Sequence, residues 1–543
     1  MRARTRFAIA AALSLAGCGG GGGPLTVGTR VETGRDIDGT WFWQPRRLAY
    51  TRVAASGMAA ADDLWVHDLN EGQARLALQD LEWSASSFWE TFRIGNLLVT
   101  GDGSFMLAYD VETRARGGFV VGQVPVLRRD GGALADWRQP SFRDESIHIG
   151  PLSGARAIDG FITRAADFIG TDLAVLGHRT QDPAGEQVIA RVSSADGSIS
   201  TLAAGLPTWT PTATSDLVAI GCLPPQLSCR YFQVLGCAAD TPACPDTGEI
   251  PCAIAFARDV ADASPAQLVP AVYDVNRGAM LPVDGRLPAD GGGYLRSPDG
   301  LRVAWTDGNM MRVWDACTRR TLGCQATNLP VQIDRFAWRP DSGAVSGVGG
   351  RVELLVLSVD DGTCTTPATA APSSVFYSQD GSKMGWLDLP SSTQDRTLWI
   401  ADGRGQGAVA TASGPIIDAV FSPDTRYLVV RRFHDNAGSI GVIDTAAAHP
   451  VERPIASATS FTMALGTRRL LAMTRWNSQD RSGQIELFDL AQGTSTVLAE
   501  PVTSLAAAGS VDDATDIAYV MRTRSPSAFD GLWFATLPPA DAP

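Results

Sequence analysis

The residues of this chain with the most obvious chemistry are its cysteines. Besides Cys18 there are eight, at Cys222, Cys229, Cys237, Cys244, Cys252, Cys317, Cys324 and Cys364. Cysteines in such numbers either pair as disulfides or, as thiolates, bind a metal such as zinc. The first five are separated by six or seven residues instead of two, and no histidine lies among them. That spacing does not match a zinc site, so we predict disulfides and no bound metal.

The segment 222–252 also carries five prolines, and we expect an irregular insertion that its disulfides hold together. Cys317 and Cys324 flank a short turn after an apparent strand, so we expect these two to be joined to each other. The remaining pairings stay open, because spacing alone does not give connectivity. Oxidation of all eight requires a compartment outside the cytoplasm.

No other set of residues forms a recognisable catalytic constellation. The histidines occur singly, without a zinc-binding spacing, and we expect them to make structural hydrogen bonds: His67, His148, His178, His434 and His449. There is no Gly-x-Ser-x-Gly elbow and no phosphate-binding loop, and Lys383 is the only lysine. We therefore predict no catalytic residue and no cofactor. Carboxylates that meet from distant repeats would escape this search, which leaves a lyase or hydrolase acting on polysaccharide or peptide as the alternative.

The N-terminus has the features of an export signal. Three arginines among the first six residues precede a short apolar run, Phe7 to Leu15, that is too short to span a bilayer. Leu15-Ala16-Gly17-Cys18 resembles the lipobox of bacterial lipoproteins, and this resemblance implies a signal peptide over 1–17 and an acylated Cys18. Five glycines follow, so 18–30 is expected to be a flexible tether. Gly19 directly after the cysteine resembles lipoproteins that are sorted to the outer membrane.

The rest of the chain is acidic and has no apolar window long enough for a membrane helix. The net charge of the full sequence is −13, and a surface this acidic repels nucleic acid and anionic head groups. We therefore exclude nucleic acid as a partner and expect contact with the membrane through the lipid anchor only. The expected location is the outer membrane, facing the periplasm or the cell surface.

A repeated turn organises the C-terminal half. It appears as Ser297-Pro298-Asp299-Gly300, and later copies begin at Arg339, Ser378 and Ser422, with the aspartates 42, 39 and 44 residues apart. Proline presets the backbone at the second turn position, aspartate caps the turn through its side chain, and a glycine or small polar residue closes it. The turn predicts a β-hairpin, and a further strand such as Leu354–Leu357 follows each one.

Short, evenly spaced strands with a period of roughly 40 residues predict an all-β fold, a β-propeller of four-stranded blades. The unit Phe421-Ser422-Pro423-Asp424 and the hydrophobic strand after it resemble the TolB-type, WD40-like repeat of bacterial periplasmic propellers, and the resemblance covers 291–540. Over 31–290 the strands are spaced more widely, and the cysteine-rich insertion interrupts them. We expect one propeller of about eight blades, with two propellers split near residue 290 as the alternative.

Fold alone does not choose a function, because propellers host many unrelated activities. Without a catalytic motif, we expect a binding or scaffolding module whose partner is a cell-envelope protein or glycan. Binding would use a blade face or the mouth of the central channel, where loops vary while strands keep their shape. A structural envelope protein without a small ligand is a third possibility.

Overall fold

The structure is a computed structural model, and the part of the chain that it describes consists of strands and turns, with no helix in that part. The all-β prediction is therefore confirmed over the described residues. These residues are 26–44, 46–53, 61–82, 97–99, 105–108, 110–112, 121–128, 134–141, 144–150, 156–158, 161–170, 172–179, 187–193, 196–206, 232–237, 241–259, 268–287, 294–325, 333–349, 353–368, 372–388, 395–434, 437–447, 450–457, 463–477, 480–508, 511–513 and 515–540.

The described strands form nine sheets, and seven of these contain four antiparallel strands in sequence order. In the first half of the chain these sheets are β2–β5 (Ile37–Gln44, Arg47–Val53, Ala61–Asp68, Gln73–Glu82), β13–β16 (Phe161–Ile169, Asp172–Arg179, Gln187–Val192, Ile199–Leu206) and β17–β20 (Phe232–Gly236, Cys252–Asp259, Leu268–Asp274, Ala279–Leu281). In the second half they are β21–β24 (Leu295–Arg296, Arg302–Asp307, Met310–Asp315, Arg320–Gln325), β25–β28 (Ile333–Trp338, Ala344–Gly349, Glu353–Ser358, Cys364–Ala368), β29–β32 (Pro372–Tyr377, Lys383–Asp388, Arg396–Asp402, Val409–Gly414) and β33–β36 (Ile416–Phe421, Tyr427–His434, Ala437–Asp444, Glu452–Ser457).

The two remaining sheets have seven strands each. One is formed by β6 (Leu97–Val99), β7 (Phe105–Ala108), β8 (Asp110–Glu112), β9 (Val121–Arg128), β10 (Leu134–Ser141), β11 (Asp144–Gly150) and β12 (Arg156–Ile158). The other is formed by β37 (Met463–Leu465), β38 (Arg469–Asn477), β39 (Ser482–Asp489), β40 (Ser495–Ala508), β41 (Thr515–Met521), β42 (Gly531–Leu537) and β1 (Thr29–Thr33).

The long strand β40 explains the size of the last sheet. Its first part pairs with β39, and from Val502 onward it pairs with β41. It therefore serves as the outer strand of β37–β40 and as the first strand of a unit that continues with β41 and β42. The N-terminal strand β1 completes that unit by pairing with β42, with Thr29 opposite Phe534 and Thr33 opposite Gly531.

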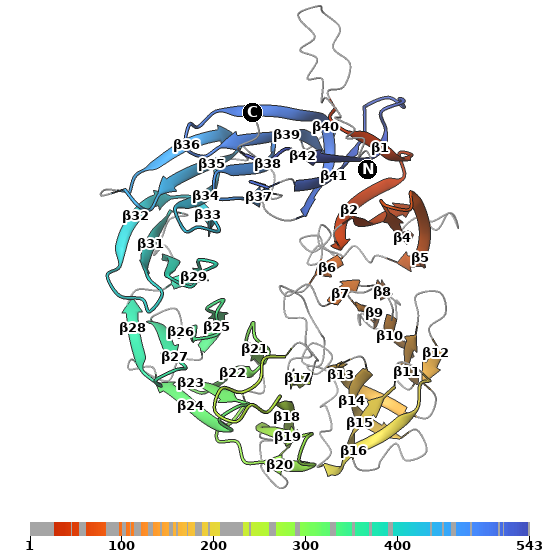
Figure 1. The fold of residues 1–543 in the computed structure, drawn as a ribbon, viewed down its shortest axis with the longest axis vertical. Coiled ribbons are helices and arrows are strands. Elements are labelled where there is room, and N and C mark those ends of the chain that lie inside the picture. The colour runs from red at the N-terminus through yellow and green to blue at the C-terminus, as the bar shows by residue number, and fades with distance from the viewer. Residues whose placement is uncertain are drawn as a thin grey trace, which may run out of the picture.

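The sheets follow one another around a ring, and β1 lies beside the C-terminal strands (Figure 1). This is the arrangement of a β-propeller. Its hydrophobic core is divided among the junctions between neighbouring sheets, and the strands supply alternate residues to the two sides. In β27, Leu355 and Leu357 pack toward β21–β24, whereas Leu354 and Val356 pack toward β29–β32. Burial on both faces is why such strands are continuous apolar runs.

Packing continues across residue 290, where the chain could have divided into two propellers. A single core cluster joins Leu235 and Ala255 of β17 and β18 to Val303 and Trp305 of β22. Buried hydrogen bonds cross the same junction: Gln233 Nε2 donates to the Tyr294 carbonyl over 2.6 Å, and the Tyr294 hydroxyl donates to the Phe256 carbonyl over 3.0 Å.

The repeated Ser-x-Asp turn has one hydrogen-bonding pattern in its copies. The hydroxyl of Ser378 donates to Asp380 Oδ1 over 2.7 Å and accepts the Lys383 amide over 2.9 Å. Ser297 and Ser422 make the same pair of contacts, each with the aspartate two residues later and the amide five residues later. The fourth turn position has positive φ, and Ser342 (61°) and Thr425 (63°) adopt it as well as glycine.

We predict that the aspartate side chain stabilises its turn. The variant Asp380→Ala loses the acceptor for the Ser378 hydroxyl, for the Ser382 amide at 3.0 Å and for the Ser382 hydroxyl at 2.9 Å. Its free energy of unfolding in a urea titration should fall by about 1 to 2 kcal/mol. Asp246→Ala is the matched control, because Asp246 is exposed and has no polar contact among the described residues. Equal stability of the two variants would contradict the role of the cap.

Candidate functional site: the turn face

One end of the sheets forms a continuous surface of turns, which we name the turn face. It consists of the turns between first and second strands (297–300, 339–342, 378–381 and 422–425) and between third and fourth strands (315–319, 358–362, 402–405 and 444–447). In an antiparallel sheet of four strands these two turns lie at the same end. Contacts between turns of neighbouring sheets make the surface continuous.

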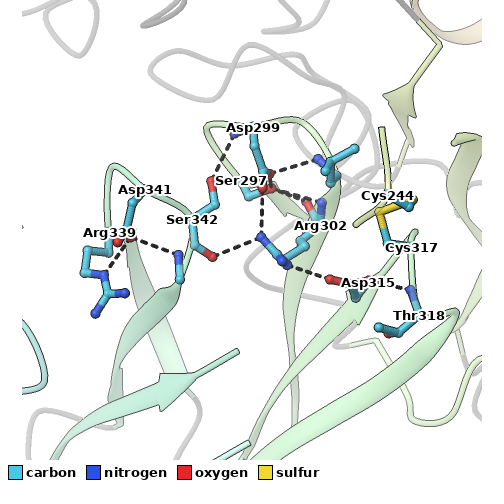
Figure 2. Close-up of polar contacts among 12 residues, drawn as sticks. Cys244, Ser297, Asp299, Arg302, Asp315, Cys317, Thr318, Arg339, Asp341 and Ser342 are labelled. Atoms are coloured by element: carbon cyan, nitrogen blue, oxygen red, sulfur yellow. Dashed lines mark hydrogen bonds and ion pairs between the residues drawn. A yellow bond between two sulfur atoms is a disulfide. The ribbon is translucent and has the colours of Figure 1, made fainter. Parts of the chain in front are cut away.

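The junction of β21–β24 with β25–β28 shows how the contacts work (Figure 2). The Asp299 amide donates to the Ser342 hydroxyl of the next sheet over 3.0 Å. Arg302 extends from β22 and pairs with Asp299 at 2.8 Å and with Asp315 at 2.6 Å, while it also donates to the Ser342 carbonyl at 3.3 Å. One guanidinium group thus ties both turns of its own sheet to the first turn of the next, as five donors in a planar fork allow.

Arg339 replaces the serine of the repeat, and the substitution has a structural use. Its Nε donates to Asp341 Oδ1 over 2.6 Å, so it supplies the hydrogen bond that the serine hydroxyl makes elsewhere. The Arg339 side chain then covers Gly381 of the next sheet, where a Cβ atom would come within 2.8 Å of Arg339 Cγ. The φ of +68° at Gly381 is one that Ser342 and Thr425 also adopt, so the close approach of Arg339 is what requires glycine here.

Lys383, the only lysine of the chain, joins β29–β32 to β33–β36. Its Nζ lies 2.7 Å from Thr445 Oγ1, and that hydroxyl donates to the Thr425 carbonyl over 2.6 Å. At the next junction Arg453 donates to the carbonyls of Leu490 and Ala491.

The turn before β38 lacks its own aspartate, and a neighbour supplies the cap. Asp512, on the turn between β40 and β41, accepts the amides of Arg468 at 2.9 Å and Arg469 at 3.0 Å, and also that of Thr467. At the seam between the last and first sheets, Arg46 lies 3.8 Å from Asp516 and 5.1 Å above the ring of Phe534. Junction contacts at this end of the sheets therefore run from β21 to β42 and on to the first sheet.

Three disulfides lie within the part of the chain that the structure describes. Cys237 pairs with Cys252 at the base of the insertion, Cys244 pairs with Cys317, and Cys324 pairs with Cys364. The last two link successive sheets: Cys244 and Cys317 join β17–β20 to β21–β24, and Cys324 and Cys364 join β24 to β28. The predicted disulfide between Cys317 and Cys324 is wrong. Cys317 lies in the turn before β24, and Cys324 lies near the end of that strand, so the extended strand keeps the two thiols apart. Cys324 instead faces the next sheet, where it is bonded to Cys364.

The remaining cysteines and the histidines singled out in the sequence do not gather at one site in the described structure. Cys18, Cys222 and Cys229 lie outside the described residues, so their predicted roles stay predictions. His67 is buried in β4 and its Nδ1 lies 3.0 Å from Glu32 Oε1 of β1, across the seam. His148, His178 and His434 belong to three further sheets, β11, β14 and β34, and His449 lies outside the described residues.

Within the described residues, no three His, Cys, Asp or Glu side chains gather as a metal site. That same part of the chain holds no helix able to span a bilayer.

The disulfide connectivity can be measured directly. Peptide mapping of the unreduced protein should yield fragments that join Cys244 to Cys317 and Cys324 to Cys364. A fragment that joins Cys317 to Cys324 would contradict the structure. The double variant Cys244→Ser/Cys317→Ser should lose roughly 4 kcal/mol of unfolding free energy, because the crosslink closes a loop of 73 residues in the unfolded chain. Cys237→Ser/Cys252→Ser, which opens a loop of 15, should lose roughly 3 kcal/mol.

Asp388 lies at the end of β30 that is opposite to the turn face. Burial raises the pKa of its carboxyl, and a hydrogen bond of 2.6 Å from Trp399 Nε1 opposes that shift in part. Its Oδ1 is buried and has no hydrogen-bond partner in the described structure. Such a carboxyl could hold a proton for chemistry, but an acid in glycoside cleavage also needs a second carboxylate, and none of the described residues supplies one in contact with Asp388.

The raised pKa of Asp388 predicts a pH dependence of stability. A carboxyl whose pKa is higher in the folded state favours folding below its unfolded pKa of about 3.9, and that contribution is lost as the pH rises through the folded pKa. The unfolding free energy of the parent minus that of Asp388→Asn, measured by urea titration, should therefore be larger at pH 4 than at pH 7. Asp361 is the control with the opposite sign: hydrogen bonds from Thr363 lower its pKa to about 2, so its contribution is lost as the pH falls. A parent-to-variant difference for Asp388 that does not change with pH would contradict the assignment.

Comparisons with known proteins place the chain in no family: no family model matches it, and no curated protein does. Similar solved structures include the tricorn protease, which is 10% identical with a TM-score of 0.29 over 93% of this chain and 61% of that one. A eukaryotic initiation factor is 13% identical with a TM-score of 0.38, over 75% of this chain and 97% of the other. The Cps50 (Swd1) β-propeller domain of Myceliophteria thermophila is 11% identical with a TM-score of 0.26, over 49% and 89% of the two chains. The chain spans less than two thirds of the tricorn protease, and similarities this low carry no argument about activity.

Proposed function

We propose that this protein is a lipid-anchored β-propeller of the cell envelope that binds another envelope component on its turn face. The observation that carries the proposal is the set of junction contacts on that face, from the Asp299 amide and Ser342 to Lys383 and Thr445. A surface whose turns are fixed to one another loses little conformational entropy when a partner binds. The partner is a protein or a glycan.

The proposed architecture is one propeller closed through the N-terminal strand. The core cluster that crosses residue 290 supports one propeller over two. Three observations at the seam support closure: β1 pairs with β42, a core cluster joins Ile37 and Tyr50 to Val520 and Leu532, and Arg522 Nη2 donates to the Ile37 carbonyl over 2.8 Å.

The proposed location is the outer membrane, with the propeller facing the periplasm or the cell surface. The resemblance of Leu15–Cys18 to a lipobox and the five glycines after it support this proposal. Residues at the end of the tether are held by the last sheet: Thr26 Oγ1 lies 2.8 Å from the Tyr519 hydroxyl, and the Val27 amide donates to it over 3.1 Å. An anchor at Cys18 would thus hold the last sheet near the membrane.

Replacement of the acylated cysteine tests the anchor. The variant Cys18→Ala should move from the outer-membrane fraction to the soluble envelope fraction, because without acyl chains the chain has no other means of membrane attachment in this proposal. Cys229→Ala, which removes a different cysteine, should remain with the membrane. A Cys18→Ala protein that still sediments with the outer membrane would overturn the anchor.

Chemical crosslinking in the native envelope, followed by purification and analysis of both protein and glycan, tests the binding function. A single protein recovered in stoichiometric amount, or one bound glycan, supports the proposal. Recovery of cleaved glycan or peptide fragments would favour the enzyme instead. Recovery of the chain alone would contradict a binding role.

A further inference from the structure

The insertion between β17 and β18 differs from every described turn of the same type. In the sheets from β21 to β36, the first and second strands are joined by a turn with its own short hydrogen bond, as from the Gly300 amide to the Ser297 carbonyl. Here Cys237 and Cys252 are 15 residues apart in sequence, and their disulfide brings the Cα atoms to 4.3 Å. The chain therefore leaves the turn face at one point and returns at the same point. We name its described part, residues 241–251, the braced loop.

The inner side of the braced loop is fixed to two sheets. Cys244 is buried and bonded to Cys317 of the neighbouring sheet. Glu249 lies 3.1 Å from Arg319, whose guanidinium also lies 3.3 Å from Asp274. Asn276 Nδ2 donates to the Ile250 carbonyl over 2.9 Å. A disulfide, an ion pair and a hydrogen bond thus hold the loop from below.

The loop is also fixed within itself. The Gly248 amide donates to the Cys244 carbonyl over 2.8 Å, and the Cys244 amide donates to the Glu249 carbonyl over 2.9 Å. These bonds close a tight turn around Pro245, Asp246 and Thr247. Its conformation is therefore set before any partner arrives.

The outer side of the braced loop is exposed and mostly apolar. Pro242, Ala243, Pro245 and Gly248 are exposed, and Ile250 is one of the few large hydrophobic side chains of the described chain that water reaches, with 45% of its surface accessible. Asp246 is exposed between them, and its carboxylate has no hydrogen bond or ion pair within the described structure. An exposed apolar side chain beside an unpaired charge, on a loop that is already rigid, offers a partner two contacts at little cost in conformational entropy.

We propose that the braced loop docks a protein of the envelope that offers an apolar pocket to Ile250 and a basic side chain to Asp246. The proposal rests on the binding function proposed above and names the surface and the partner's chemistry. The acidic charge of the whole chain, −13, favours a basic partner surface and steers its approach. Glu249 is paired with Arg319, so Asp246 is the carboxylate of the braced loop that is exposed without a partner in the described structure.

The test is photocrosslinking at single positions of the full chain in its native envelope. Benzoylphenylalanine at Ile250 should give one discrete protein adduct. The matched control is the same group at Val451, which lies between the third and fourth strands of its sheet and is more exposed, at 73%. No adduct of that mass should form from position 451. Adding Asp246→Arg to the Ile250 probe should reduce the adduct at least fivefold.

The protein captured at position 250 is then purified and its affinity for the full chain measured. Ile250→Ser and Asp246→Arg should each weaken binding about tenfold or more, and Val451→Ser should not change it. Both loop residues are exposed, so thermal unfolding of the variants should match the parent, which separates binding from folding. No adduct at 250, equal adducts at 250 and 451, or an adduct insensitive to Asp246→Arg would overturn the docking surface. If chemical crosslinking still captures a partner in that case, the binding function stands and another surface carries it.

Discussion

The structure depends on a serine hydroxyl that donates one hydrogen bond and accepts another inside a tight turn. In Ser297, Ser378 and Ser422 the hydroxyl donates to the aspartate two residues on and accepts the amide five residues on. The first and second strands of a sheet are thereby held in register at the end where the chain reverses. Register decides which side chains of the second strand reach each neighbouring sheet, so these turns also determine how the core is divided among the junctions.

The same turns carry the contacts that join one sheet to the next. Ser342 accepts the Asp299 amide, Arg339 covers Gly381, and Asp512 caps the turn before β38 from the adjacent unit. Propeller sheets pack through apolar side chains, which are not directional, so polar contacts at the rim fix their angle more closely than burial alone can. The result is a face whose shape is determined by the scaffold, and the braced loop adds an exposed apolar anchor to it.

The sequence predicted the strands and turns well because the repeat is local: Ser-Pro-Asp-Gly and the apolar strand after it lie within about ten residues of each other. Contacts between repeats could not be predicted from the sequence. The pairs Cys244–Cys317 and Cys324–Cys364 join residues 73 and 40 apart, and proximity in sequence wrongly favoured Cys317 with Cys324. Two signals could have pointed to junction residues: Arg339 departs from the serine of the repeat, and Lys383 is the only lysine. Neither says which neighbour it contacts, because that depends on the angle between sheets.

If the turn face is a fixed surface, the backbone amides that donate to its serine hydroxyls must be protected from hydrogen exchange as well as the amides of the strands are. Hydrogen exchange resolved at single residues would decide this for the amides of Arg302, Lys383 and Tyr427, which donate to serine hydroxyls over 2.9 Å in three of the four copies of the turn. We expect these amides to exchange at rates close to those of the buried strand residues Val303, Met384 and Leu428. Exchange of the three turn amides as fast as in an unfolded peptide, with the strands still protected, would show that the face is loosely held and would contradict a preformed binding surface.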